Sequence, residues 1–330
     1  MGVAHLVIIT RTPLRISLGG GGTDLPSYYR RSGGFLIAAA ISKYVFIAIN
    51  RNFDDAVLLK YSSIEKVPRA SGVQHPLMRE ALLMTGVDAR VEISSMADVP
   101  AGTGLGSSGT FTVGLLRALH AYRHQVVTNL DLAEQACHLE IDRLEEPIGK
   151  QDQYIAAVGG LTAFEFDADD SVGVHPVPLS DPTRYQLEDN LLLFFTGVRR
   201  SASEVLAVEQ APSASVDLVQ NLDEVQALGR ETMATLVDGD LDAFGHLLTR
   251  QWKLKYDRSP TETHHAIDRL IRSGIAAGAS GGKLVGAGGG GFLLFYAEDK
   301  RALRDAMRAE GLEELRFRID YEGSTTIVAQ

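Results

Sequence analysis

The sequence has little of what several classes of protein require. Its 330 residues contain one cysteine, Cys137, which excludes an intrachain disulfide and a cysteine-based zinc site. The net charge is −10 and no block of five like charges occurs, so we expect no nucleic-acid partner. No apolar run reaches about 18 residues, so no membrane span is expected. The first residues lack the pattern of a signal peptide, and we therefore expect a cytoplasmic protein.

Two common nucleotide-binding signatures are also missing. There is no G-x-x-x-x-G-K-[ST] segment. Residues 104–109 match the dinucleotide-binding G-x-G-x-x-G formally, but that signature requires the glycines directly after a strand and a second strand after the helix. Here "MADVPAGT" precedes the glycines, and a second helical segment follows the first. This context counts against an NAD-dependent oxidoreductase.

What is present is the composition of a globular protein, with 45% apolar and 22% charged residues. Segments rich in Val and Ile predict strands, and apolar residues three and four apart predict helices from residue 107 to 144. The polar, proline-containing stretch 167–189 is the best domain boundary. After it come a strand "NLLLFFTG", long helices to about residue 273, a glycine-rich loop and two more strands. Strands and helices mix without βαβ alternation, so we predict an α+β fold with lobes 1–180 and 181–330.

The segment "PAGTGLGSSGTF" predicts the start of a helix that runs to about Tyr122. Helix N-termini present unpaired N–H groups and a partial positive charge, and glycines let a phosphate approach them. A serine hydroxyl at that terminus can also reach a magnesium ion bound to the phosphate. Alternatively, Ser107 simply caps the helix. Capping alone does not explain three glycines in six residues.

Two acidic residues follow. On a helix, Glu140 lies in the middle of the apolar arc that contains Ala136 and Ile141. A carboxylate on a buried face is costly unless it is paired, so it either forms an ion pair or binds a metal ion such as magnesium. Asp152 follows Pro147 and a glycine, near the start of a new helix. It either stabilises the helix dipole or serves as a general base for a hydroxyl nucleophile.

The N-terminal segment "SLGGGGTD", residues 17–24, has four consecutive glycines. Because glycine loses the most conformational freedom on folding, such a run is costly unless something must approach the backbone closely. A tight turn, a phosphate cradle, and a pocket with main-chain walls all remain open.

Three segments in order resemble the motifs of the GHMP kinases, which act on galactose, homoserine, mevalonate and phosphomevalonate. They are "RTPLRISLGGGGTD", "PAGTGLGSSGT" and "KLVGAGGGGFLLF", and the resemblance covers nearly the whole chain. It implies a two-lobed fold, with a ribosomal protein S5 domain 2-like N-terminal domain and a ferredoxin-like α+β C-terminal domain. "GGGGTDLPSYY" resembles the branch of heptose 7-phosphate kinases and their fucokinase-like relatives, and "GKQDQYIAAVGGL" the heptose kinases in particular.

The resemblance implies that ATP phosphorylates the anomeric hydroxyl of D-glycero-D-manno-heptose 7-phosphate, giving the α-1,7-bisphosphate for GDP-heptose and surface polysaccharide synthesis. By family position, Ser108 and Glu140 would bind Mg²⁺, Asp152 would deprotonate or orient the hydroxyl, and Arg15 would stabilise the transferring phosphoryl group. The residues expected at the ATP phosphates are Pro100, Gly102, Gly104, Leu105, Gly106, Ser107, Ser108, Gly109 and Thr110. Those expected at the sugar are Gly20, Gly21, Gly22, Thr23, Asp24, Gly288 and Gly289.

The phosphate loop departs from the family pattern at Gly109, an extra glycine that loosens the first helical turn by about 1 kcal/mol relative to alanine. Either Ser108 or Thr110 can therefore supply the hydroxyl for the metal.

The second phosphate of the substrate needs a cation. The candidates are Lys150, Arg199, Arg200, Lys253, Lys255 and Arg258. We favour the Arg199–Arg200 pair, which follows a predicted strand and can clamp a phosphate, with Lys150 as a further candidate.

Two other functions stay open beside the heptose kinase. One is a kinase of an unphosphorylated sugar such as L-fucose or mannose, which has no use for a second phosphate-binding cation. The other is a non-catalytic sugar or nucleotide sensor, although such a sensor would tolerate loss of Asp152 or Glu140 and both are present. The expected partners are a small sugar phosphate and ATP. The oligomeric state, with a homodimer as one option, is also open.

Overall fold

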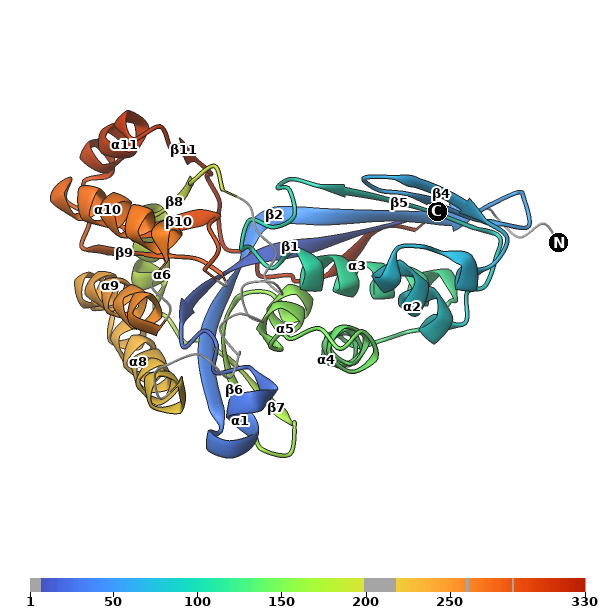
Figure 1. Cartoon of the computed structure of the whole chain (residues 1–330), viewed down its shortest axis with the longest axis horizontal. Helices are drawn as coiled ribbons and strands as arrows, with labels where there is room; N and C mark the ends of the chain where they lie inside the picture. Colours follow the sequence, from blue (N-terminus) through green and yellow to red (C-terminus); the bar gives the residue numbers. More distant parts are fainter. Residues whose placement is uncertain (1–6, 199–217, 259–260, 287, 330) are drawn as a thin grey trace.

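The computed structural model describes residues 7–198, 218–258, 261–286 and 288–329. The chain forms two lobes, one built on a long twisted sheet and one on a small sheet covered by helices (Figure 1). The favoured phosphate clamp, Arg199 and Arg200, lies outside the described residues.

The first lobe is built on an eight-stranded sheet with the main order β12-β1-β2-β5-β3-β4, to which β6 and β7 are added beside β2. All pairings are antiparallel except that of β3 with β5. The strands are β1 (Ile8–Gly19), β2 (Gly34–Arg51), β3 (Val57–Lys60), β4 (Ile64–Val67), β5 (Val91–Ala97), β6 (Leu161–Phe166), β7 (Val172–Pro176) and β12 (Thr325–Ala329).

Strand β1 runs from the predicted apolar segment through the first motif as far as Gly19. Its Pro13 lies in the interior of the sheet, where the missing N–H would normally break a ladder hydrogen bond. The register between β1 and β2 shifts between Pro13 and Leu14, and this irregularity accommodates the proline. As a result, β1 places Arg15 beyond the bulge, four residues before the strand ends.

The helices of the first lobe are α1 (Pro26–Ser32), η1 (Ala70–Gly72), α2 (Pro76–Thr85), α3 (Ser107–Tyr122), α4 (Asn129–Cys137), η2 (His138–Arg143) and α5 (Gln151–Val158). Of these, α3 and α5 pack on β1 and β2, while α2 and α4 pack against α3 (Figure 1). The predicted single helix around Glu140 is in fact α4 continued by η2, one turn of π-helix. Such turns occur frequently at functional sites.

The second lobe has four antiparallel strands in the order β11-β8-β10-β9. In chain order this is 4-1-3-2 with helices on one face, which confirms the ferredoxin-like α+β expectation. Its elements are α6 (Asp181–Asn190), β8 (Leu191–Phe195), α8 (Leu218–Asp238), α9 (Leu241–Arg258), α10 (Glu262–Ala276), β9 (Gly281–Leu284), β10 (Phe292–Tyr296), α11 (Lys300–Ala309) and β11 (Glu313–Glu314). The second lobe also has a hydrophobic cluster of its own, separate from the main core, which includes Trp252, Ile267 and Phe295.

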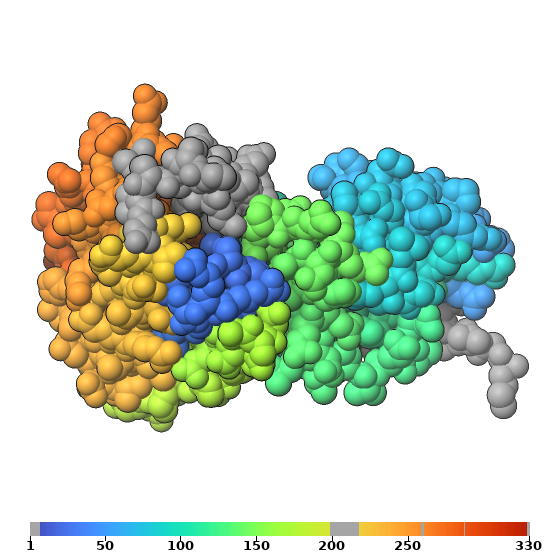
Figure 2. Space-filling model, turned by 60° about the horizontal axis from the view of Figure 1, so that its bottom comes forward, coloured from blue at the N-terminus to red at the C-terminus, as the bar shows by residue number. Residues whose placement is uncertain are grey.

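Besides the chain connection near residue 180, a returning strand and a side-chain hydrogen bond join the two lobes. The last strand, β12, leaves the second lobe and pairs with β1 in the first sheet. Figure 2 shows the blue N-terminal segment lying between the yellow helices of the second lobe and the green part of the first. There, Tyr28 of α1 donates a hydrogen bond of 2.7 Å to Asp223 of α8. The division into residues 1–180 and 181–330 stays a prediction, and it does not describe β12. Within the described ranges, no helix is both long and apolar enough to cross a membrane.

Candidate active site

The glycine-rich segment after β5 leads directly into α3, whose first residue is Ser107. The N-cap position is Gly106, and no side chain caps this helix. The Ser107 hydroxyl is buried and has no hydrogen-bond partner within the described residues. A capping role for Ser107 is therefore wrong. This hydroxyl and the unpaired N–H groups of the first turn are groups that a bound anion can satisfy.

Glu140 is 1% exposed and meets α3 from the π-helical turn. It accepts hydrogen bonds from Ser108 Oγ at 2.5 Å and from Gln153 Nε2 at 2.7 Å. Within the described residues its carboxylate has no ion-pair partner, which counts against the ion-pair explanation. Thr110 instead donates to the Pro13 carbonyl at 3.1 Å, which directs its hydroxyl into the core. Of the two hydroxyls, only that of Ser108 contacts the buried acid.

Burial raises the pKa of Glu140 to about 7, against the opposing effect of the hydrogen bonds from Ser108 and Gln153. A buried carboxylate in need of a positive charge, beside a serine hydroxyl, is a hard-oxygen donor set. Since both Ser108 and Glu140 line the larger cavity described below, a magnesium ion would be able to reach them from it. The residues present therefore fit the expected metal.

Arg15, which is buried, forms an ion pair with the half-buried Asp152. Arg15, 4% exposed, donates from Nε to Asp152 Oδ1 at 2.7 Å and from Nη1 to the Gly104 carbonyl at 2.5 Å. Asp152 is the second residue of α5, as the sequence predicts. One guanidinium thus links the first motif, the glycine-rich loop and the acid proposed as base.

The extra glycine of the phosphate loop has a structural reason. A Cβ at Gly109 would lie 2.8 Å from Asp152 Cβ and 3.1 Å from the Gln153 nitrogen. Any side chain at this position would push the start of α5 away from α3. Gly109 therefore sets the position of Asp152, and this offsets the cost of a glycine in the first helical turn.

Two cavities meet at this ion pair. The larger encloses about 940 Å³ and contains the phosphate loop, Glu140 and the glycines at 288–290. The smaller encloses about 120 Å³ between the two lobes. Only three residues line both cavities within the described part of the chain, and they are Arg15, Ile148 and Asp152.

The smaller cavity is bordered by the four-glycine segment. Gly21 and Gly22 line it together with Asp24, whose carboxylate accepts from the backbone nitrogens of Gly22 and Gln151, each at 3.1 Å. Burial raises the pKa of Asp24 above its usual value. Gly20 has φ = 79°, and a Cβ there would lie 2.1 Å from the Phe35 carbonyl oxygen. The segment is thus a tight turn at its start and a pocket wall at its end.

The larger cavity is apolar and aromatic away from the phosphate loop. Its lining there includes Tyr61, His75 and Phe111, and the His75 ring lies 4.9 Å from Tyr61 and 5.9 Å from Phe111. Aromatic faces of this kind suit a planar base. The cavity therefore has one end for a planar apolar group and one end for anions.

The structure separates the residues predicted for the site into four groups. Those at the larger cavity are Gly102, Gly104, Gly106, Ser107, Ser108, Gly109, Glu140, Gly288 and Gly289. Those at the smaller cavity are Gly21, Gly22 and Asp24, and those at both are Arg15 and Asp152. Gly288 and Gly289 were expected at the sugar but lie with the phosphate loop, because the second glycine-rich loop folds over it. Those that line neither cavity are Pro100, Leu105, Thr110, Gly20, Thr23 and Lys150.

Several members of the last group have structural contacts instead. The Leu105 carbonyl accepts from the backbone nitrogen of Arg15 at 3.0 Å. The Thr23 hydroxyl donates to the carbonyls of Gly20 and Phe35 at 2.8 and 2.9 Å. These residues hold the cavity walls in place without lining them.

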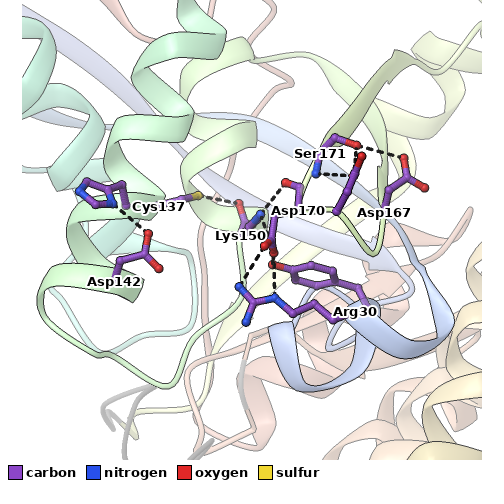
Figure 3. A network of polar contacts seen from close by, with 10 residues as sticks. Arg30, Cys137, Asp142, Lys150, Asp167, Asp170 and Ser171 are labelled. Carbon is purple, nitrogen blue, oxygen red and sulfur yellow. Dashed lines mark hydrogen bonds and ion pairs between the residues drawn. The ribbon is translucent and has the colours of Figure 1, made fainter.

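Lys150 points away from both cavities. Its ammonium donates to the Asp170 carbonyl at 2.8 Å and lies 5.0 Å from the centre of the Tyr29 ring. Figure 3 shows Lys150 and Arg30 converging on Asp170, next to the contacts of Asp167 with Ser171. This network ties the loop before α5 to the β6–β7 turn, and the structure gives Lys150 no role at a second phosphate.

Sequence reasoning named only part of the cavity lining that comes from the second lobe. Lys283 and Gln251 line the smaller cavity, together with Lys255 and Arg258. Lys255 and Arg258 were among six basic candidates that nothing in the sequence could rank. Lys283 was within the third motif, but a lone lysine in a strand gives no signal of its burial.

Two protein-family models match the chain, one in each lobe. The model described as GHMP kinases N terminal domain matches residues 72–160, and the one described as GHMP kinases C terminal matches residues 232–312. Together they cover slightly more than half of the chain. The two matches lie in the first and second lobe, respectively.

Individual relatives cover nearly the whole chain. D-glycero-alpha-D-manno-heptose 7-phosphate kinase of Campylobacter jejuni is 27% identical over 92% of this chain and 94% of its own length. The bifunctional fucokinase/GDP-fucose pyrophosphorylase of Arabidopsis thaliana is 26% identical over 93% of this chain, which spans 30% of that protein. A solved structure of a D-glycero-D-manno-heptose 1-phosphate kinase from Bacteriodes thetaiotaomicron superposes with a TM-score of 0.78 at 23% identity, covering 97% of this chain and 98% of its own.

Proposed function

The chain belongs to the GHMP kinase family of ATP-dependent phosphotransferases, and from that premise we propose that it phosphorylates the anomeric hydroxyl of D-glycero-D-manno-heptose 7-phosphate. The product would be the α-1,7-bisphosphate, a precursor of GDP-heptose for surface polysaccharide. The sequence similarity to a heptose 7-phosphate kinase over most of both chains supports this substrate.

The observation that carries the proposal is the shared wall of the two cavities. Arg15 and Asp152 line both, so a donor in the larger cavity and an acceptor in the smaller one would meet at this ion pair. Phosphoryl transfer depends mainly on positioning and on neutralising charge, and this geometry supplies both. A binding protein with a single ligand would not need two cavities joined at an ion pair.

At the donor end, the residues would hold ATP by its two chemically different parts. The aromatic lining with Tyr61 and His75 would receive adenine, and the start of α3 with the orphaned Ser107 hydroxyl would receive the phosphates. Ser108 and Glu140 would hold Mg²⁺, which when bound offsets the negative charge of the phosphates. Arg15 would add a positive charge beside the transferring group.

At the acceptor end, Asp152 would take the proton. The sugar oxygen forms a bond to the γ-phosphorus, the bond from that phosphorus to the bridging oxygen breaks, and ADP leaves with the electron pair. Arg15 occupies Asp152 Oδ1, which leaves Oδ2 to accept the hydroxyl proton. Because an anomeric hydroxyl is more acidic than an ordinary alcohol, a carboxylate is a sufficient base. Asp24 would accept hydrogen bonds from other sugar hydroxyls.

The test is ADP release with Mg-ATP over a panel of D-glycero-D-manno-heptose 7-phosphate, mannose, mannose 6-phosphate, L-fucose and galactose, with the product position read by phosphorus NMR. We expect strong preference for the heptose 7-phosphate and a new phosphate at C1. Asp152→Asn should lower kcat by about 100- to 10,000-fold. The matched control is Asp142→Asn, which removes an exposed carboxylate and should leave kcat unchanged.

Each other result has a definite meaning. Equal or better turnover of L-fucose or mannose would keep the kinase and reject the heptose 7-phosphate. No turnover of any sugar, with ATP still binding, would favour the sensor. An Asp152→Asn variant with undiminished kcat would reject Asp152 as base while leaving the substrate assignment intact.

A further inference from the structure

We propose that the second-lobe wall of the smaller cavity, formed by Lys255, Arg258 and Lys283, binds the terminal phosphate of the sugar substrate. This inference rests on the proposed function, since it assigns the site that a sugar already phosphorylated at its far end would need. It assigns that charge to residues other than Lys150 and the Arg199–Arg200 pair, and the pair lies outside the described residues.

The smaller cavity has walls of opposite charge. The first lobe contributes the carboxylates of Asp24 and Asp152, the second of which is paired with Arg15. The second lobe contributes three cations, Lys255 and Arg258 from α9 and Lys283 from β9. Carboxylates accept hydrogen bonds from neutral hydroxyls but repel a phosphate, whereas lysine and arginine bind one. A ligand with hydroxyls at one end and an anion at the other matches both walls. An unphosphorylated sugar would match only the first.

Lys283 provides the evidence that the cationic wall is built for an anion. It is 7% exposed, and its ammonium donates to Gln251 Oε1 at 2.9 Å. Within the described residues no carboxylate forms an ion pair with it. Burial, with the charges of Lys255 and Arg15 adding to it, lowers the pKa of Lys283 to about 7. An ammonium kept out of water without a counter-charge is costly, and an anion in the cavity would remove that cost.

The position of Lys283 is fixed by its partner. Gln251 donates from Nε2 to the Leu18 carbonyl at 2.9 Å, and so links α9 to the end of β1. The same amide therefore orients the ammonium of the second lobe relative to the strand that carries Arg15. Nothing about this arrangement depends on surface side chains that solvent could move.

The helix α9 presents a stripe to the cavity. Gln251, Lys255 and Arg258 are four and three residues apart, which puts them on one helix face. Lys255 donates to the Gly286 carbonyl of the second glycine-rich loop. Arg258 reaches the four-glycine segment, since a Cβ at Gly22 would lie 3.7 Å from its Nη1. The cations therefore extend from the second glycine-rich loop to the glycine wall of the sugar pocket.

The test measures kcat and KM for two sugars, D-glycero-D-manno-heptose 7-phosphate and the same heptose without the phosphate. Both are measured for the unsubstituted enzyme and for the variants Arg258→Gln, Lys255→Met and Lys283→Met. Loss of one charge-assisted contact should raise KM for the 7-phosphate by about 10- to 100-fold. The kcat/KM for the unphosphorylated heptose and the KM for ATP should change by less than about 3-fold. The matched control is Lys253→Met, an exposed lysine of the same helix, which should change none of the three constants.

The outcomes separate this inference from the proposed function. If the variants lose activity equally on both sugars, or if KM for ATP rises instead, the cations serve the transferring phosphate and the inference is wrong, while the kinase assignment stands. If the unsubstituted enzyme prefers the unphosphorylated heptose, the proposed substrate fails and this site with it. Should Lys283→Met not fold, Arg258→Gln together with the same sugar pair gives the same decision.

Discussion

Glu140 in the first lobe and Lys283 in the second are two buried charges of opposite sign. Burial shifts the pKa of each to about 7, up from the ordinary value for the acid and down for the amine. Glu140 lines the larger cavity and Lys283 the smaller one. Among the described residues neither group has an ion-pair partner, so a ligand of opposite charge would compensate each of them. The binding energy of the two ligands would then include relief of a cost that folding left in place.

Among the variants that probe the two buried charges, Glu140→Gln should have the largest effect, because it keeps the shape and removes the charge. Loss of an outer partner of a metal site typically costs 10- to 100-fold, so loss of a direct ligand should lower kcat/KM by at least about 100-fold. Steady-state kinetics over a range of Mg²⁺ concentrations measures this. The control is Glu134→Gln on the exposed side of α4. Normal activity with an unchanged magnesium requirement would exclude Glu140 as a ligand.

Gly109→Ala should perturb the first-lobe site without changing either charge. The added methyl would meet Asp152 Cβ at 2.8 Å and displace the start of α5. Because Asp152 is the proposed base, moving its carboxylate away from the sugar hydroxyl should lower kcat by about 10- to 100-fold. The control is Gly72→Ala, whose nearest neighbour would be at an ordinary 3.5 Å. If kcat is unaffected, the close approach of α3 and α5 does not set the position of Asp152.

The pH dependence of stability should have opposite signs for the two charges in the protein without ligands or metal. The folded-state pKa of Glu140 is raised from 4.5, so the folded protein holds the extra proton and stability falls as pH rises from about 4.5 to 7. The folded-state pKa of Lys283 is lowered from 10.5, so the unfolded chain holds the extra proton and stability rises from pH 7 to about 10.5. Together the two groups should give a minimum of stability near pH 7.

Urea unfolding with EDTA across this pH range measures both slopes. The change in unfolding free energy should be on the order of 3 kcal/mol over the acidic window and about 5 kcal/mol over the basic one. Glu140→Gln should remove the acidic slope and Lys283→Met the basic one, and both variants should be more stable than the parent at pH 7. The assignment of the two slopes to Glu140 and Lys283 would be contradicted if the stability of the parent protein shows no minimum near pH 7. It would also be contradicted if the variants keep both slopes.

The smallest effect should come from Lys150→Met. Its ammonium is directed to the Asp170 carbonyl and not to a cavity, so KM for the sugar phosphate should change by less than about 3-fold. Stability should fall by about 1 kcal/mol, the typical value of one hydrogen bond. Kinetics and urea unfolding, run beside Lys255→Met, test this. A rise in KM as large as that of Lys255→Met would show that Lys150 does reach the phosphate.

The sequence was informative where a motif is local and uninformative where a site is assembled from distant segments. The start of α3 at Ser107, the start of α5 at Gln151 and the burial of Glu140 were all predicted, because glycines, breakers and helical periodicity act within a few residues. Elements such as β4, β7 and β9 were missed because they are short and because charged residues, glycine or proline interrupt their apolar residues.

Side-chain partners were harder to predict than elements. The sequence could not show that Thr110 turns to the Pro13 carbonyl while Ser108 turns to Glu140, since the choice depends on how α3 packs on β1. It could not distinguish Lys150 from Lys255, because both are single lysines near breakers or helix ends. Only the packing of the two lobes decides which of them lines the smaller cavity.

The return of the chain to the first sheet has a consequence for dissecting the protein. β12 pairs with β1, the strand that carries Arg15, and is the outermost strand on that side of the sheet. A fragment ending at residue 180 would therefore leave β1 as an open edge, with unpaired backbone groups that promote aggregation. The protein cannot be divided into two independently expressed halves by a single cut. An isolated first lobe would have to be produced as a fusion that restores residues 325–329 behind a linker.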